Sequence, residues 1–188
     1  MGGPAFEAHM NGRLTIETER LRLTALTAEA LSAWIDLDAE TLRDETGVDF
    51  DEPVETPPLL GEDLPMFRER MREAAEDLGW WVWLVSTRED NRAVGVCGLG
   101  GRPDEGAVDL GYSVYPLVEG RGYATEASEA LIQWVLAHEE ATSVRAAVPT
   151  WNLASVAVAK KLGMTEVGHE VTEEVGEVAV FEVARAPR

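Results

Sequence analysis

Cysteine and histidine are scarce in this sequence, and their scarcity excludes several kinds of site. Cys97 is the only cysteine among 188 residues, so no disulfide can form within the chain and no multi-cysteine metal site can exist. The three histidines, His9, His138 and His169, have no metal-ligand spacing. Cys97 lies in the apolar stretch AVGVCGLG, which predicts a small buried strand residue rather than a nucleophile. We expect no metal, and a reducing compartment such as the cytoplasm.

Basic residues and long apolar runs are also few. The chain has 16 Lys and Arg against 35 Asp and Glu, a net charge of −19. Such a surface repels phosphate backbones and anionic membranes, so we expect neither nucleic acid nor membrane as a partner. A cationic or amine-bearing partner suits it better, and acidity that serves only solubility is the alternative. No apolar run approaches the ~20 residues of a membrane span, and the start MGGPAFEAHMNG lacks the pattern of a secretory signal.

The overall composition is that of a folded protein. Hydrophobic residues make up 45% and charged residues 27%, close to the average of globular proteins. The length fits one domain better than two. We expect a flexible lead at 1–12 and a single domain over 13–188.

The order of apolar patterns predicts mixed secondary structure. Residues 13–26 alternate as a strand interrupted near Glu19, 27–42 have helical spacing behind a Thr27 N-cap, and the acidic, proline-containing 49–63 form a loop. The following predicted elements are a helix at 63–78, two strands within 79–101, a strand at 106–116, a helix from about 123, a strand at 143–151, a helix at 152–163, and strands at about 164–171 and 176–184. This order does not alternate regularly, so it predicts a mixed sheet covered by helices rather than a doubly wound one.

Three tryptophans open the first strand of the 79–101 region. Strand alternation would put Trp81 and Trp83 on one face and Trp80 on the other. Such a dense aromatic strand is typical of a core, and a wall of a substrate pocket is the alternative.

A glycine-rich turn, EGRGYA at 119–124, precedes the third predicted helix. Glycines at 120 and 122 let the backbone turn tightly and bring its N–H groups close to a ligand, and the positive end of the helix points at the same place. Arg121 adds local positive charge. The turn therefore predicts a phosphate cradle, with an ordinary strand-to-helix turn as the alternative. The Walker pattern and the dinucleotide fingerprint both fail, for lack of a Lys-Ser/Thr pair and of a third glycine.

The helix predicted at 152–163 has its own end signals. Asn152 is a good N-cap, Gly163 follows its last turn, and Lys160 and Lys161 suit its negative end.

Three stretches together carry a resemblance. TERLRL at 18–23, LGY at 110–112 followed by GRGYATEA at 120–127, and the helix NLASVAVAKKLGM at 152–164 resemble the GCN5-related N-acetyltransferases (GNAT), in particular the branch of ribosomal-protein N-terminal acetyltransferases. The resemblance covers about 14–184. It implies an α/β (α+β) fold with a central mixed, mostly antiparallel sheet of about seven strands flanked by about four helices.

The resemblance also implies acetyl-CoA as the donor. Its diphosphate would lie on the backbone amides of the glycine turn, and its pantetheine arm would pair with the edge of the preceding strand like an added strand. The implied cofactor-binding residues are Tyr112, Ser113, Val114, Tyr115, Glu119, Gly120, Arg121, Gly122, Tyr123, Ala124, Thr125, Asn152 and Ser155.

The resemblance implies a catalytic role for few side chains. Ser155 matches the family position proposed to protonate the departing thiolate, with a solvent-facing serine as the alternative. The N–H near Val114 would stabilise the developing oxyanion. Asp109 and Tyr112 are the two candidates for removing the proton of the acceptor amine, and strand alternation puts them on opposite faces. An ordinary solvated carboxylate is the alternative for Asp109.

One position departs from the family pattern. The first residue of the cofactor motif, usually Gln or Arg, is Glu119 here, and a carboxylate repels phosphate at close range. The departure is harmless only if this side chain points away from the ligand.

The sequence thus predicts an acetyl-CoA-dependent N-acetyltransferase that acts on a primary amine, either a protein N-terminus or a small amine. A non-catalytic acyl-CoA-binding or regulatory module is the alternative. The acceptor would be selected mainly by the loop at 43–63 and the final hairpin. Members of the family are often dimers, so a homodimer stays open.

Overall fold

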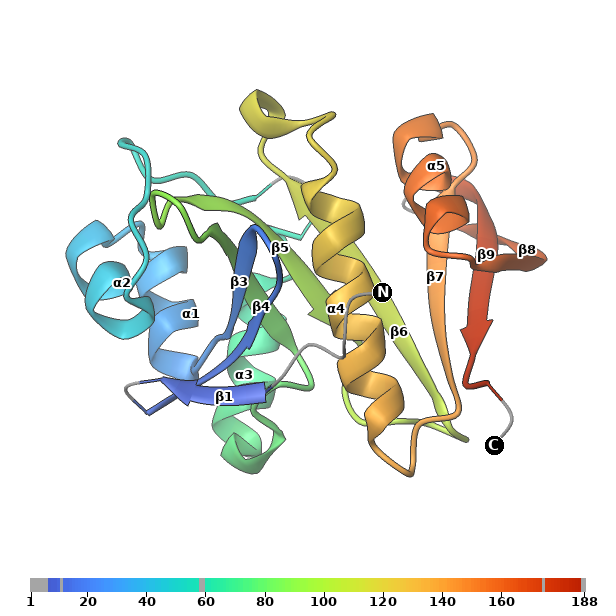
Figure 1. Cartoon of the computed structure of the whole chain (residues 1–188), viewed down its shortest axis with the longest axis horizontal. Helices are drawn as coiled ribbons and strands as arrows, with labels where there is room; N and C mark the ends of the chain where they lie inside the picture. Colours follow the sequence, from blue (N-terminus) through green and yellow to red (C-terminus); the bar gives the residue numbers. More distant parts are fainter. Residues whose placement is uncertain (1–6, 11, 58–59, 174, 187–188) are drawn as a thin grey trace.

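The computed structural model describes residues 7–10, 12–57, 60–173 and 175–186, and within them nine strands form one sheet (Figure 1). The strands are β1 (Glu7–Met10), β2 (Arg13–Glu17), β3 (Leu21–Ala25), β4 (Val82–Thr87), β5 (Ala93–Leu99), β6 (Ala107–Val114), β7 (Ser143–Pro149), β8 (Thr165–Thr172) and β9 (Gly176–Ala184). The helices of these residues are α1 (Ala28–Ile35), α2 (Ala39–Thr46), α3 (Leu64–Glu73), α4 (Tyr123–Ala137) and α5 (Leu153–Lys161), with short 3₁₀ turns η1 (Ala75–Asp77) and η2 (Pro116–Val118).

The sheet is mixed and mostly antiparallel, as the sequence predicts. Its strand order is β1-β2-β3-β4-β5-β6-β7-β9-β8, and only the β6–β7 pair is parallel. The parallel pair arises because α4 carries the chain back across the sheet between these two strands. The α/β fold class is confirmed, with two more strands and one more helix than predicted.

Both additional strands lie at the start of the chain. Residues 13–26 form a hairpin of β2 and β3 instead of one interrupted strand, with Ile16 opposite Leu23. Across the turn, the Thr18 amide and hydroxyl donate to the Leu21 carbonyl, and the Thr18 hydroxyl accepts a bond from the Leu21 amide. These bonds close the turn that reverses the chain. The sequence predicts a flexible lead at 1–12; residues 1–6 and 11 lie outside the described residues, and Glu7–Met10 pair with β2 as β1. The unpaired N–H and C=O groups of an edge strand accept a neighbouring strand whatever its side-chain pattern.

The additional helix comes from a break in the predicted helix 27–42. Leu37 has φ of 56°, a left-handed conformation that no helix continues through. Asp38 then caps α2, because its carboxylate accepts the Thr41 amide at 3.1 Å. Thr27 caps α1 as predicted, with its hydroxyl 3.1 Å from the Ala30 amide.

Helices cover both faces of the sheet. One apolar cluster joins α4 to β2 through β6, and a second joins α1, α2 and α3 to the opposite face of β4 and β5. A third cluster packs α5 against β7 and β9, and partly buried Val158 and Leu162 of α5 also contact the first cluster. Helices α4 and α5 therefore lie on the same face, in front of the sheet in Figure 1.

The three tryptophans are mostly core, but their predicted faces are wrong. Trp80 and Trp83 are buried together against Trp134 of α4, with ring centroids 5.0 and 5.3 Å from it. Trp81 turns to the other face and lies 6.2 Å from the Phe67 ring. Because β4 begins only at Val82, strand alternation does not apply to the two residues before it.

Candidate functional site

Strands β6 and β7 pair only at their beginning. The parallel register covers Ala107–Asp109 of β6, although this strand continues to Val114 and β7 continues to Pro149. Beyond Asp109 the two strands separate, while β6 keeps its pairing with β5 and β7 with β9. The separation leaves the later part of β6 with one edge that no neighbouring strand of the described sheet occupies.

Hydrogen bonds to β5 show which backbone groups face this open edge. Tyr115 donates its N–H to the Val94 carbonyl at 3.0 Å, and the Asp109 carbonyl accepts a bond at 2.9 Å from an amide just beyond β5. Such bonds alternate along an antiparallel strand, so the N–H and C=O groups of Tyr112 and Val114 point away from β5. They point to the side on which β7 has separated.

The glycine turn lies directly after β6 and η2. Gly120 and Gly122 have φ of 74° and 82°, which L-residues with side chains adopt only with strain. Gly122 is the N-cap of α4, and no side chain caps this helix. The first bond within the helix is from the Glu126 amide to the Gly122 carbonyl, at 3.1 Å. The backbone amides of the first turn therefore have no partner inside the helix, as an anion site requires.

The turn's own charged side chains are exposed. Glu119, Gly120 and Arg121 all lie at the surface, and a Cβ added to Gly120 would meet nothing within 4 Å. The predicted phosphate cradle, defined here as Glu119–Thr125, thus has an accessible backbone and room for a ligand.

Helix α5 begins close to β6 and brings two predicted residues together. The Asn152 side chain accepts the Ser155 amide at 3.1 Å, which confirms its role as N-cap. The Tyr112 hydroxyl donates to the Ser155 carbonyl at 2.8 Å. This bond fixes the first turn of α5 beside the separated part of β6.

The environment of Tyr112 sets what its hydroxyl can do. Burial raises the pKa of this hydroxyl above its ordinary value, and the side chain is 8% exposed. The group therefore stays protonated at neutral pH and already donates its proton to Ser155. It is poorly suited to accept a proton from an incoming amine.

Asp109 lies apart from Tyr112 and Ser155. Its side chain is exposed, and alternation places it on the opposite face of β6 from Tyr112, as predicted. It occupies the last paired position before β6 and β7 separate. The structure therefore brings Ser155 together with Tyr112, and leaves Asp109, the other candidate proton acceptor, on the opposite face.

The described parts of the 49–63 loop, residues 49–57 and 60–63, cover this opposite face. The Tyr115 hydroxyl and the Trp34 indole both donate to the Glu55 carbonyl, at 2.8 and 3.1 Å. Leu60 lies so close to β6 that a Cβ on Gly111 would be 3.3 Å from it. Ser113, another predicted cofactor residue, is buried between these two positions. The loop thus contacts β6 between Gly111 and Tyr115, the same stretch whose alternate backbone groups point to the open edge.

A further group of polar residues, which was not predicted from the sequence, contacts the cradle. Glu126 in the first turn of α4 accepts hydrogen bonds from Thr18 and Arg20 in the β2–β3 turn. An acidic residue in the first turn of a helix was the visible signal, but its partners lie more than 100 positions earlier in the chain. A cleft of about 570 Å³ adjoins this contact, and it is lined by Glu17, Thr18, Glu19, Arg20, Gly122, Thr125, Glu126, Glu129, Ala130, Gln133 and Lys161.

The described residues contain neither a metal-ligand cluster nor a membrane-spanning helix. No group of three or more His, Cys, Asp or Glu residues in them is placed to hold a metal ion. Over the same part of the chain, no helix has the length and apolar character to cross a membrane.

Comparisons with known proteins agree on one family. The model of the acetyltransferase (GNAT) domain matches residues 20–165. A Bacillus subtilis protein described as the uncharacterized N-acetyltransferase YjdG is 29% identical over 149 residues, which are 79% of this chain and 88% of the relative.

Solved structures show the same fold. The ribosomal-protein alpha-N-acetyltransferase RimL, in complex with coenzyme A, superimposes with a TM-score of 0.63 at 17% identity, over 89% of this chain and 95% of its own. A variant of the spermidine N-acetyltransferase SpeG from Vibrio cholerae does so with a TM-score of 0.62 at 15% identity, over 89% and 95%.

Proposed function

The chain belongs to the GNAT family of N-acetyltransferases, and from this premise we propose that it holds acetyl-CoA at the cradle and transfers its acetyl group to a primary amine of a cationic acceptor. The observation that carries the proposal is the uncapped first turn of α4, placed directly after a strand whose backbone edge is open. The two features together offer amides for a diphosphate and a strand edge for an extended amide chain.

The residues of the cradle fit a diphosphate. The first-turn amides and the positive end of α4 favour negative charge, and the exposed Arg121 adds a cation. The carboxylate of the exposed Glu119, at the rim of the cradle, repels a diphosphate bound there. The pantetheine arm would continue along Tyr112 and Val114, whose backbone groups point away from β5.

The proposed chemistry needs few groups from the protein. Acetyl-CoA supplies a thioester carbonyl that an unprotonated amine attacks, and its carbon–sulfur bond breaks as the amide forms. We assign a backbone N–H of β6 near Val114, one that the pantetheine arm leaves free, to the carbonyl oxygen, where it stabilises the negative charge that develops. Ser155 gives its hydroxyl proton to the departing sulfur and is reprotonated from solvent.

Asp109 is the proposed proton acceptor for the amine; it lies five positions before Val114, about 16 Å along an extended strand, so it acts through a relay of waters. Primary amines must lose a proton, since their ordinary pKa values are about 8 at a protein N-terminus and about 10.4 on lysine. Tyr112 is less suitable because burial raises the pKa of its hydroxyl. Asp109 is on the face covered by the 49–63 loop, so the acceptor would approach from that face while Ser155 serves the donor from the other.

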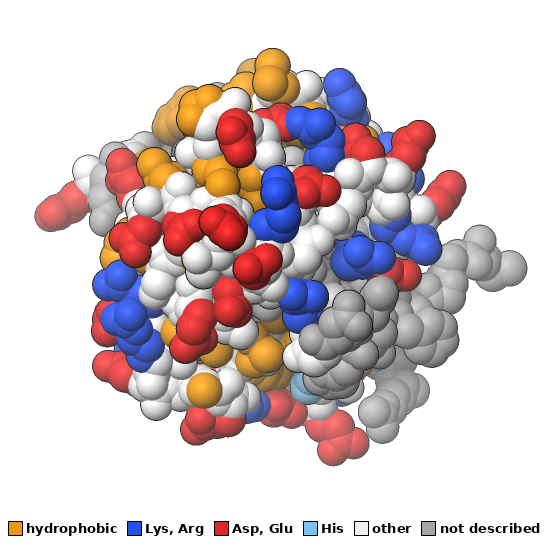
Figure 2. Space-filling view, turned by 90° about the vertical axis from the view of Figure 1, so that its left-hand side faces the viewer, with side chains coloured by type: hydrophobic (Ala, Val, Ile, Leu, Met, Phe, Trp, Pro, Cys, Tyr) orange, Lys and Arg blue, Asp and Glu red, His pale blue; other side chains and the backbone are white. Residues whose placement is uncertain are grey.

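Charge supports a cationic acceptor. The 49–63 loop carries exposed carboxylates beside the Tyr115 face of β6, and Figure 2 shows acidic side chains spread over the neighbouring side of the molecule with basic ones between them. The exposed acids of this loop include Glu52, Glu55, Glu62 and Asp63, and the Glu55 carbonyl accepts the Tyr115 hydroxyl. Structural relatives named for a ribosomal-protein N-terminus and for spermidine show which two amine classes to test first.

An assay of coenzyme A release tests the proposal. Acetyl-CoA would be incubated with spermidine, with a basic peptide that has a free N-terminus, and with a matched acidic peptide, and free thiol would be followed with a chromogenic reagent. We expect faster release with the two cationic amines, and a rate that falls as salt screens the attraction. Equal rates for the basic and acidic peptides at all salt concentrations would refute the cationic acceptor.

Substitution of the two proposed catalytic residues completes the test. Ser155→Ala and Asp109→Asn should each slow turnover by about 100-fold or more, while the Kd for acetyl-CoA stays within about twofold, because general acid–base catalysis contributes about that much. Full activity in both variants would refute their assigned roles. Tight binding of acetyl-CoA without thiol release for any amine would instead support a non-catalytic acyl-CoA-binding module.

A further inference from the structure

The turn between β2 and β3 is bound to the first turn of α4. One oxygen of the Glu126 carboxylate accepts the Thr18 hydroxyl at 2.6 Å and the Arg20 amide at 2.9 Å, and the other accepts Arg20 Nε at 2.6 Å. The Glu126 side chain is only 18% exposed, so water screens these bonds less than at an open surface. Three hydrogen bonds from one turn to one carboxylate fix the position of Arg20 relative to α4.

The same arginine contacts the cradle backbone. Arg20 Nη1 donates to the Arg121 carbonyl at 3.0 Å, and its guanidinium carbon lies 5.0 Å from the centre of the Tyr123 ring. A Cβ on Gly122 would be 3.4 Å from Arg20 Nη2. One side chain therefore touches three consecutive residues of the cradle.

Peptide geometry gives this contact a directional effect. The carbonyl of Arg121 and the N–H of Gly122 belong to one planar peptide and point in opposite directions. When Arg20 holds this carbonyl, the Gly122 N–H is aimed away from the guanidinium, toward the other side of the turn. Two glycines with positive φ leave the turn free to adopt other conformations, so an external contact is needed to select this one.

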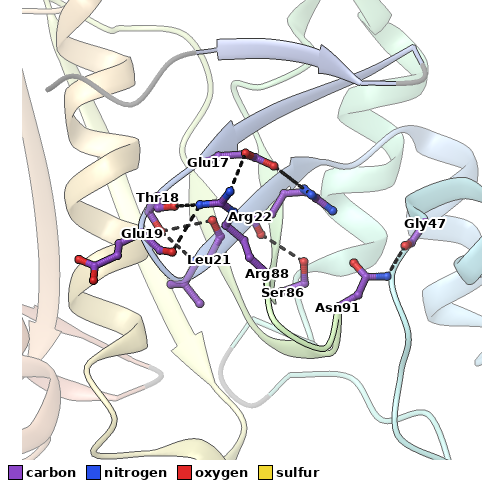
Figure 3. A network of polar contacts seen from close by, with 9 residues as sticks. All are labelled: Glu17, Thr18, Glu19, Leu21, Arg22, Gly47, Ser86, Arg88 and Asn91. Carbon is purple, nitrogen blue, oxygen red and sulfur yellow. Dashed lines mark hydrogen bonds and ion pairs between the residues drawn. The ribbon is translucent and has the colours of Figure 1, made fainter. Parts of the chain in front are cut away.

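The β2–β3 turn is itself held from behind, so it can act as a support. Arg88 Nη1 donates to the Thr18 carbonyl at 2.8 Å and to the Glu19 carbonyl at 3.4 Å, and the Arg88 amide donates to the Arg20 carbonyl at 2.8 Å. Figure 3 shows Arg88 reaching these carbonyls while Glu17 pairs with both Arg88 and Arg22. The support extends from the β4–β5 turn through the β2–β3 turn to the cradle.

We propose that Arg20, fixed by Glu126 and Thr18, is a positioning residue that holds the Arg121–Tyr123 backbone in its anion-binding conformation. The inference rests on the proposed function, because the anion is the diphosphate of acetyl-CoA. Arg20 acts through geometry rather than charge, since the carboxylate of Glu126 neutralises its guanidinium at 2.6 Å. A lysine at the same place would keep the charge and lose the fork that reaches Glu126 and Arg121 at once.

Calorimetric titration with acetyl-CoA separates these roles. We expect Arg20→Gln and Arg20→Lys each to weaken binding by about tenfold, the effect of losing roughly one charge-assisted hydrogen bond. Arg22→Gln is the matched control, because Arg22 also makes two bonds to one carboxylate, at 3.0 and 2.9 Å to Glu17, and does not touch the cradle. Its affinity should stay within about twofold of the wild type.

Two kinetic constants and a double variant complete the design. The KM for acetyl-CoA should rise in both Arg20 variants while the KM for the amine stays unchanged, which a general loss of stability would not produce. Wild-type affinity in Arg20→Lys would show that only charge matters, and wild-type affinity in Arg20→Gln would show no role at all; either result overturns the inference. A Glu126→Gln, Arg20→Gln double variant should be no weaker than Arg20→Gln alone, because the two residues act as one unit.

Failure of the proposed function would be recognised separately. If the wild type did not bind acetyl-CoA, the amides at 120–125 would still report the support through hydrogen exchange in the free protein. Faster exchange there in Arg20→Gln than in Arg22→Gln is the expected result, and equal exchange would overturn the inference.

Discussion

Replacing either of two tyrosines on β6 by phenylalanine should separate the donor side of the site from the acceptor side. Tyr112 and Tyr115 each donate one hydrogen bond of 2.8 Å to a backbone carbonyl, of Ser155 and of Glu55 respectively. Tyr112 faces α4 and α5, whereas Tyr115 faces the 49–63 loop. The pair is matched in chemistry and in bond length, and differs in what each bond fixes.

The expected stability loss is similar for both variants. Removing a hydroxyl that bonds a carbonyl costs about 0.5–1.5 kcal/mol of unfolding free energy, because the carbonyl loses its partner. For a chain of this length, 1 kcal/mol corresponds to a melting shift of about 2–4 °C. Tyr112→Phe should be at the upper end, since its side chain is 8% exposed and water replaces the lost bond less easily.

The kinetic effects should differ. Tyr112→Phe frees the first turn of α5, so we expect a lower kcat and a weaker affinity for acetyl-CoA. Tyr115→Phe frees the loop at Glu55, so we expect a higher KM for the amine with little change in acetyl-CoA affinity. Steady-state thiol release with both substrates varied measures all of these constants. The same kinetic change in both variants, or the reverse assignment, would refute the two-sided arrangement.

Three other predictions test single positions. Glu119→Gln should tighten acetyl-CoA binding severalfold in a calorimetric titration, because it removes a carboxylate from the rim of the cradle; unchanged affinity would mean that this side chain points away. Burial alone would raise the pKa of Glu126, but the hydrogen bonds from Thr18 and Arg20 lower it below its ordinary value. In urea titrations from pH 7 to 3, the unfolding free energy lost in Glu126→Gln should therefore be constant above about pH 6 and disappear as the pH falls below the ordinary range of a carboxyl. An equal loss at pH 3 would contradict this. Gly95→Ala should destabilise the protein by more than about 2 kcal/mol, because its Cβ would be 2.2 Å from the Ser113 carbonyl oxygen; a melting temperature like the wild type's would contradict the close approach.

Features set by neighbouring residues could be predicted from the sequence. The cradle depends on two glycines and the start of one helix, and the caps at Thr27 and Asn152 depend on a side chain and an amide three positions later. The two positive-φ glycines and both caps were expected and are present, and phosphate binding at the turn stays a prediction. Their physical causes lie within a few residues, where composition and spacing are informative.

Features set by distant contacts could not be predicted. The bonds from Tyr112 to Ser155 and from Arg20 to Glu126 join positions 43 and 106 residues apart, and no periodicity in the sequence relates them. The break at Leu37 was missed because apolar residues continue at helical intervals on both sides of it. The faces of Trp80 and Trp81 depended on where β4 begins, and element ends are poorly determined by patterns.

The central claim is that the backbone of the cradle holds the diphosphate of acetyl-CoA, and thermal unfolding of two variants at one position tests it most directly. Gly120 has φ of 74° and open space at its Cβ, and Asn and Asp both tolerate this conformation, so Gly120→Asn and Gly120→Asp should fold alike. At about 100 times its Kd, acetyl-CoA should stabilise the wild type by about 2.7 kcal/mol. We predict that the Asn variant keeps most of this shift and that the Asp variant loses most of it, because its carboxylate repels the diphosphate. No shift in the wild type, or equal shifts in the two variants, would contradict the account.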